Sequence, residues 1–227
     1  HKLIMMSSTY RQASIHPEQD SYVDMDFENR RFWRQNRRRL DAEALRDAML
    51  EVSGQLNRSV GGRSFYPRAS SEALEGLSNK GNAWGRSSLS DRCRRSIYMV
   101  TRRSRLLPLM TTFDFSDTTL PCAKRDVTTV APQALAMMNN HFVHAQSTAL
   151  AQRLEADRGD DVEAQVIRAW RLVLGRLPTL AEQSGALDHL AQQHEHFAAM
   201  LSEQTASGGG DQVLKPRDGL RLWLRAD

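Results

Sequence analysis

Apolar positions recur at helical spacing along much of the chain, and they predict a mainly helical protein. Apolar residues at steps of three and four indicate one buried helical stripe over residues 2–13. A longer helix is predicted from about Phe27 to Leu56, with an apolar face in its second half. Pro108 and Pro132 each open a further helix, because proline is tolerated in the first turn.

The last third of the chain carries the clearest helical pattern. Asp160 with Glu163, and Thr179 with Glu182, have the spacing of a capping box, in which two side chains cap the first turn of a helix. Apolar residues at helical steps follow each box, and Gly175 separates the two series. We therefore predict two antiparallel helices joined by a short turn.

One short stretch has the character of a strand. Residues 96–101 include four consecutive apolar or aromatic side chains, and residues 63–66 are their nearest plausible partner. Residues 61–92 are rich in Gly, Ser and Asn and predict a long surface loop. The expected anchors of this loop are Phe65, Tyr66, Leu74, Leu77 and Trp84. The predicted fold class is mainly α, an irregular helical domain with a small β element and long loops.

The end of the chain differs in composition from the rest. The helical domain is predicted over residues 1–203, and a Gly-rich linker over residues 204–212. Within residues 213–227, the leucines at 220, 222 and 224 alternate with Arg221, Trp223 and Arg225, which is the period of a strand and indicates the start of a truncated following domain. The first residues continue a helical pattern and lack the order of a signal peptide, so we expect the natural N-terminus to lie upstream.

The charge pattern argues against nucleic acid as a partner. The net charge is +4, but only four of the 31 basic residues are lysines, and the 27 acidic residues are interspersed with the arginines. Binding to a phosphate backbone needs a surface of one sign, so we expect solvated faces with ion pairs instead. No apolar run approaches the length of a membrane span, and we expect no membrane insertion.

The sequence predicts no catalytic residue, no metal site and no cofactor within this chain. His141 and His144 are three residues apart, but no third ligand stands nearby. Cys93 and Cys122 match no metal or haem-attachment spacing, and either a disulfide or two separate thiols would fit them. Motifs of nucleophilic catalysis and phosphate-binding glycine loops do not occur.

Four charged residues near position 40 suggest a structural ion-pair network. Arg38 stands three residues before Asp41, and Arg39 stands four residues before Glu43. On the long helix predicted here, these spacings would bring each arginine within reach of a carboxylate. The alternative is a surface on which the arginines bind an anion.

The polar stretch between two apolar elements is the candidate ligand-binding region. Arg125 could receive a carboxylate, sulfate or phosphate group, while Asp114 and Asp117 could accept hydrogen bonds from sugar hydroxyls. The alternative is structural: the same residues form turns, and Asp114 pairs with Arg125 to pin the loop.

Many short segments, in order along almost the whole chain to about residue 203, resemble one known family. The segments are STYRQ (8–12), NRRRLDAE (36–43), RD (46–47), RSIY (95–98), FD (113–114), Asp117, Arg125, TT (128–129), PQAL (132–135), Asn139 and LGRLPT (174–179). Together they resemble a planctomycete-specific domain of unknown function that lies C-terminal in large exported proteins. Residues 213–227 resemble, more weakly, the opening strand of a laminin-G or concanavalin-like lectin domain.

The resemblance implies an extracytoplasmic location, partner domains within the same polypeptide, and a cytochrome-c-like domain upstream that would hold haem outside this chain. It implies no established activity. Our leading hypothesis is a non-catalytic binding or scaffolding module of a large multidomain protein linked to polysaccharide handling, with glycans as ligands. The alternative is part of a glycan-acting hydrolase that other domains complete, so the sequence leaves open whether the chain belongs to an enzyme.

Overall fold

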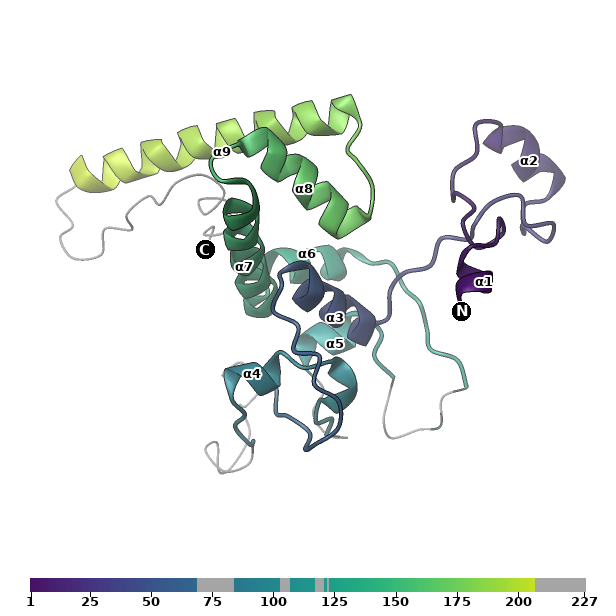
Figure 1. Cartoon of the computed structure of the whole chain (residues 1–227), viewed down its shortest axis with the longest axis horizontal. Coiled ribbons are helices and arrows are strands. Elements are labelled where there is room, and N and C mark those ends of the chain that lie inside the picture. The colour runs from purple at the N-terminus through teal and green to yellow at the C-terminus, as the bar shows by residue number, and fades with distance from the viewer. Residues whose placement is uncertain (69–83, 103–106, 117–120, 122, 207–227) are drawn as a thin grey trace. The chain divides into compact units, whose positions relative to one another are not determined.

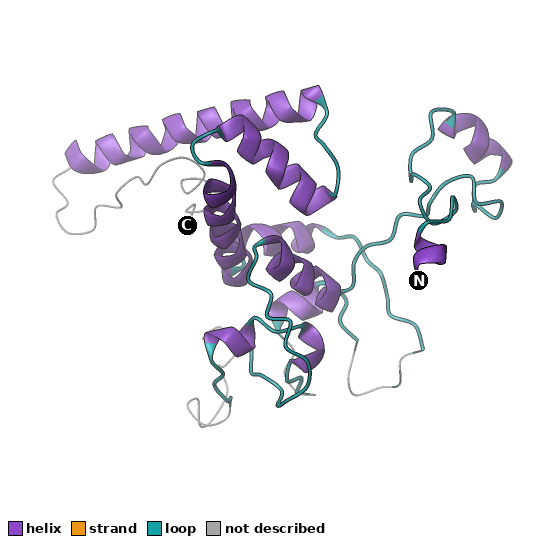
Figure 2. Cartoon of the chain, viewed as in Figure 1, coloured by secondary structure: helices purple, strands orange, loops and turns teal. Residues whose placement is uncertain are grey.

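The computed structural model describes residues 1–68, 84–102, 107–116, 121 and 123–206. The chain divides into two compact units, residues 1–40 and residues 41–227, and each is treated by itself. Helices are the main regular structure of the described residues, as Figures 1 and 2 show, and the predicted mainly helical fold class is confirmed.

The first unit holds two short helices, α1 (Lys2–Met5) and α2 (Gln19–Met25). The helix predicted over residues 2–13 is thus much shorter than expected. The Ser7 hydroxyl donates a hydrogen bond to the Ile4 carbonyl and helps to turn the chain after α1. The stacked rings of Tyr22 and Trp33, 5.5 Å between centroids, join α2 to the end of the unit.

The long helix predicted from Phe27 to Leu56 is wrong in its first half. The carboxylate of Asp26 accepts hydrogen bonds from the backbone N–H groups of Arg30 and Arg31, at 2.9 and 2.8 Å. These bonds replace the carbonyl contacts of a helix. Asn29 and Phe32 then adopt positive φ angles of 57° and 55°, which a right-handed helix excludes.

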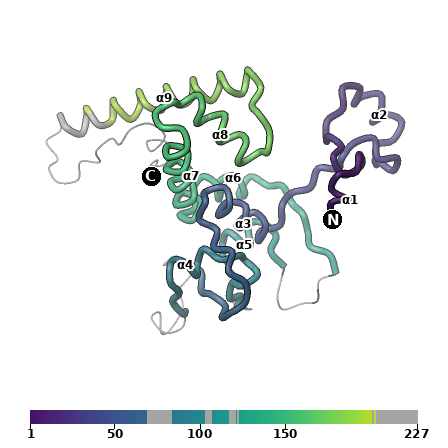
Figure 3. The backbone as a smooth tube through the Cα atoms, viewed as in Figure 1, coloured from purple at the N-terminus to yellow at the C-terminus, as the bar shows by residue number. Residues whose placement is uncertain are grey.

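Four helices surround the core of the second unit: α3 (Ala42–Val52), α5 (Pro108–Thr112), α6 (Ala131–Asn139) and α7 (His141–Arg158). Helix α3 contacts α5 and α7, and α6 contacts both of these as well, an arrangement that can be followed in Figure 3. Pro108 and Pro132 lie in the first turns of α5 and α6, as predicted. The buried core comprises Ala42, Phe65, Met99, Leu109, Met110 and Phe113.

The predicted β element is reduced to two isolated parallel bridges in the described part of the chain. One joins Phe65 to Met99, and its partner segment is the predicted one. The other joins Asn57 to Arg94, just after helix α4 (Leu89–Arg92). Residues Ser96–Tyr98 form a 3₁₀ turn, η2, rather than a strand, because the Ser96 N–H donates to a side chain on α3 and not to a neighbouring strand.

The loop anchors agree with prediction where they are described. Phe65 is buried, and the rings of Tyr66 and Trp84 meet edge to face with centroids 5.9 Å apart. Leu74 and Leu77 lie outside the described residues.

The two C-terminal helices, α8 (Val162–Leu174) and α9 (Leu180–Ala206), pack against each other as predicted. Thr179 and Glu182 form the expected capping box: the Thr179 N–H donates to Glu182 Oε2 at 2.9 Å, and the Glu182 N–H donates to Thr179 Oγ1. Asp161, one residue after the predicted Asp160, caps α8 by accepting from the Ala164 N–H.

Helix α9 runs three residues beyond the predicted domain boundary at position 203, so residues 204–206 of the predicted linker are helical. The rest of that linker and residues 213–227 lie outside the described residues. Within the described part, no helix combines the length and the apolar character that crossing a membrane requires.

Candidate functional site

A pocket of about 510 Å³ opens beside the first turns of α3. Three of the charged residues that line it lie on α3 or at its N-cap. Arg95, just before η2, is the fourth, and Arg125, in the segment before α6, is the fifth. The residues that line it are Asp41, Glu43, Ala44, Asp47, Arg95, Ser96, Ile97, Met99, Thr101, Phe115 and Arg125. Carboxylates, guanidinium groups and apolar side chains therefore face one cavity, a combination that suits a polar ligand with apolar faces.

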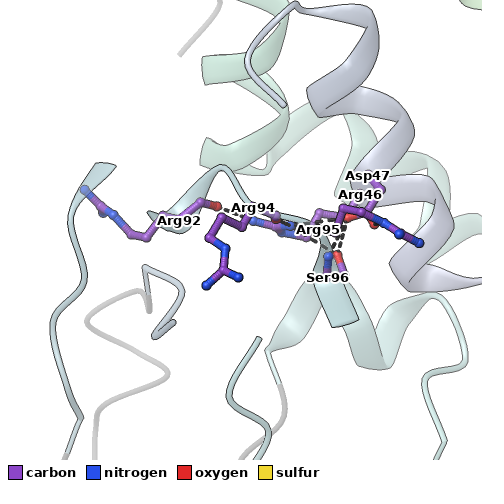
Figure 4. A network of polar contacts seen from close by, with 6 residues as sticks. All are labelled: Arg46, Asp47, Arg92, Arg94, Arg95 and Ser96. Carbon is purple, nitrogen blue, oxygen red and sulfur yellow. Dashed lines mark hydrogen bonds and ion pairs between the residues drawn. The ribbon is translucent and has the colours of Figure 1, made fainter. Parts of the chain in front are cut away.

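A buried polar network fixes η2 to α3 behind this pocket (Figure 4). The guanidinium of Arg46 donates from Nη1 to the carbonyl of Arg94 at 3.0 Å and from Nη2 to the carbonyl of Arg92. The Ser96 hydroxyl accepts from Arg46 at 3.1 Å and donates to Asp47 Oδ1 at 2.6 Å. The Ser96 N–H donates to the same oxygen at 2.7 Å.

Arg46 is only 4% exposed, so its charge needs compensation. Its guanidinium lies over the rings of Phe65 and Phe142, 5.2 Å from each centroid, and Asp47 lies 3.5 Å away. Burial lowers the pKa of Arg46, while Asp47 acts in the opposite direction. A guanidinium stays charged in proteins even so, and the network keeps a permanent cation behind the pocket wall.

Glu43 and Arg125 form a bidentate ion pair in the pocket. Arg125 donates from Nη1 to Glu43 Oε2 at 2.6 Å and from Nη2 to Oε1 at 2.8 Å. Burial raises the pKa of the Glu43 carboxyl, but the hydrogen bonds from Arg125 and from the helix backbone outweigh it, and the pKa lies below its ordinary value. Both groups are therefore ionised at neutral pH.

The residues of the ion-pair network predicted from sequence are distributed differently. Asp41 occupies the N-cap position of α3, and Glu43 binds Arg125. Arg38 and Arg39 stand in residues 35–41, which are not helical, so the helical spacing assumed for their pairing does not occur there. A network that includes these two arginines stays a prediction.

The predicted ligand-binding residues also separate. Arg125 lines the pocket. Asp114 instead accepts hydrogen bonds from the N–H of Thr128 at 2.7 Å and from its hydroxyl at 3.0 Å. Gln133, on α6, donates to the carbonyl of Thr112 and to the carbonyl of Thr128. Through Thr128, Asp114 is therefore part of a hydrogen-bond network that connects the end of α5 to the start of α6. Asp117 lies outside the described residues, as does Cys122.

Sequence reasoning did not select Asp47, Arg95 or Ser96 as site residues. Asp47 stands four residues after Glu43, a spacing that places both carboxylates on one face of α3. That spacing was a usable signal once the helix was known to begin at Ala42. The approach of Arg95 and Ser96 to α3 is a tertiary contact, and no local pattern indicates it.

Cys93 is not among the residues that line the pocket. Cys93 is half-buried near Arg46, and burial raises the pKa of its thiol, which disfavours the thiolate. Among the described residues, no three histidine, cysteine, aspartate or glutamate side chains are grouped so that they could hold a metal ion.

A helical domain with a mixed-charge pocket is the class that fold and site define. The chain belongs to the family described as PSD1, protein of unknown function (DUF1553), whose model matches residues 1–190. No curated protein and no solved structure matches the chain. The resemblance seen in the sequence to an uncharacterised family is thereby confirmed.

Proposed function

We propose that the second unit is a non-catalytic binding module that holds a saccharide in the pocket beside α3, within a large extracytoplasmic protein that handles polysaccharide. The observation that carries the proposal is the pocket itself, which combines three carboxylates and two guanidinium groups with Met99 and Phe115. Charged groups exchange hydrogen bonds with sugar hydroxyls, and apolar side chains cover the C–H faces of a sugar ring. The extracytoplasmic setting and the other domains of the polypeptide are supported by the resemblance of the sequence motifs to exported proteins.

The state of Glu43 favours binding over hydrolysis. Glycoside hydrolysis needs a carboxylic acid with a raised pKa to protonate the leaving group. The pKa of Glu43 is lowered, and both its oxygens accept hydrogen bonds from Arg125. This carboxylate is suited to bind a ligand or to fix the position of Arg125, and not to donate a proton.

The proposal can be tested by titrating the full chain with neutral and acidic oligosaccharides in a calorimeter. Ala44 lines the pocket and is exposed, so Ala44→Trp should fill the cavity without removing a polar contact. Ala198→Trp, at an exposed position on α9, is the matched control. We expect saccharide binding to the wild type and to Ala198→Trp and none to Ala44→Trp. Equal binding by all three proteins would place the ligand elsewhere, and no binding by the wild type would refute the proposal.

A further inference from the structure

We infer that the pocket selects an acidic saccharide, whose carboxylate or sulfate group is bound by Arg95. The inference rests on the proposed function and names the ligand class of the same pocket. It is based on a comparison of the charged groups in the pocket: some already have hydrogen-bond partners in the protein, and others keep donors or acceptors that a ligand can use.

Three of the pocket's charged groups, Arg125, Glu43 and Asp47, already have partners in the protein. Arg125 gives two hydrogen bonds to Glu43, so an incoming anion would compete with a bidentate carboxylate for it. Asp47 Oδ1 accepts from both the N–H and the hydroxyl of Ser96. These groups are held in position by the protein and form fixed walls.

Arg95 has donors to spare. Its side chain is 59% exposed, and in the described part of the chain its guanidinium makes one long ion pair, from Nε to Asp47 Oδ2 at 3.9 Å. The planar guanidinium carries further N–H donors in a fork that matches a carboxylate or sulfate group. Arg95 is therefore the basic group of the pocket that can receive an acid from a ligand.

Asp41 supplies the complementary acceptor. It is exposed, lines the pocket at the start of α3, and makes no capping hydrogen bond with its side chain. Asp41 and Asp47 are six residues apart, which corresponds to roughly 9 Å along a helix axis. Arg95 lies at the Asp47 end. A single sugar residue could thus place its acid group on Arg95 and a hydroxyl group on Asp41.

The test compares probes that differ only in charge. The full chain is titrated with tetragalacturonate and with its methyl ester, and in parallel with a sulfated galactan tetrasaccharide and its desulfated form. Arg95→Gln removes the proposed anion contact. Arg171→Gln is the matched control, because Arg171 is an exposed arginine on α8 that does not line the pocket. Thermal unfolding of each variant shows whether the fold is intact.

We expect an acidic probe to bind the wild type more tightly than its uncharged counterpart. Arg95→Gln should weaken binding of that acidic probe about tenfold or more, the effect of one lost charge-assisted contact, while Arg171→Gln leaves it unchanged. The acidic probe that binds, galacturonate or sulfated galactan, identifies the acid group.

Other outcomes separate this inference from the proposed function. One outcome is equal affinity for charged and uncharged probes, with binding unchanged in Arg95→Gln and lost in Ala44→Trp. It would overturn the inference and leave the proposed function standing. Tight binding of an acidic probe that survives Arg95→Gln would overturn the assignment to Arg95. A wild type that binds none of the four probes would overturn both proposals.

Discussion

The guanidinium of Arg46 lies 3.1 Å from the hydroxyl of Ser96, fifty residues further along the chain, and that hydroxyl donates in turn to Asp47. One serine thus joins a buried cation and a carboxylate from adjacent positions on α3. The contact holds η2 against the helix and places Arg95 at the edge of the pocket.

Replacing the buried arginine should have the largest effect on stability. Arg46→Met keeps an apolar stem but leaves the carbonyls of Arg92 and Arg94 without their donor, so we expect a loss of about 3 kcal/mol in the free energy of unfolding. Urea unfolding measures it, with Arg171→Met as the exposed control, expected to change by less than about 0.5 kcal/mol. Similar losses in both variants would show that the network is not specifically stabilising.

Ser96 and Asp47 should be energetically coupled. Ser96→Ala removes one acceptor and one donor from a buried position, and we expect it to cost about 1–2 kcal/mol. In a double-mutant cycle with Asp47→Ala, the two losses should fail to add by about 1 kcal/mol, because each variant breaks the hydrogen bond between Ser96 and Asp47. Additive losses would mean that the hydroxyl acts through Arg46 alone.

The Glu43–Arg125 pair should contribute stability that depends on pH. Since both side chains are partly exposed, we expect Glu43→Gln to cost about 1 kcal/mol or less at neutral pH. The pKa of Glu43 is lowered in the folded state, so the contribution is complete above the ordinary value of 4.5 and is lost as the pH falls through the lowered value.

The difference in unfolding free energy between wild type and Glu43→Gln should therefore shrink as the pH is lowered from neutral. Urea titrations across that range measure it. Glu195→Gln, at an exposed site on α9, is the control and should show no such trend. A Glu43→Gln difference that stays constant with pH would contradict the assignment.

The hairpin of α8 and α9 should lose its cap in acid. Hydrogen bonds from Arg176 and from the Thr179 backbone lower the pKa of Glu182 to about 2. The cap is thus present above the ordinary pKa of 4.5 and is lost as the pH falls towards 2. We expect Glu182→Gln to reduce helicity at neutral pH, with the difference from wild type vanishing in acid. Circular dichroism against pH checks this, and parallel curves for the two proteins would refute it.

Asp114 should prove structural. Its φ of 56° suits Asp and Asn, and its carboxylate holds Thr128 by two donors. We expect Asp114→Ala to cost about 1–2 kcal/mol and Asp114→Asn to cost less, because Asn tolerates the backbone and keeps one acceptor. Calorimetric titration should show unchanged saccharide affinity in Asp114→Asn. A loss of saccharide affinity in Asp114→Asn without a loss of stability would show that Asp114 contributes to ligand binding.

Local signals in the sequence determined the parts of the fold that depend on neighbouring residues. The capping box of Thr179 and Glu182 and the glycine stop at Gly175, with φ of 68°, act within one turn of chain and were predicted. The proline starts at Pro108 and Pro132 were predicted for the same reason.

Tertiary structure decided the remainder, because apolar periodicity does not report which distant partner a polar group will find. Glu43 was expected to pair with Arg39, four residues away, yet it binds Arg125, which stands 82 residues further along the chain. Likewise, the first three residues of the strand predicted at 96–101 form a 3₁₀ turn, because the Ser96 N–H donates to the carboxylate of Asp47, a contact that only packing against α3 makes available.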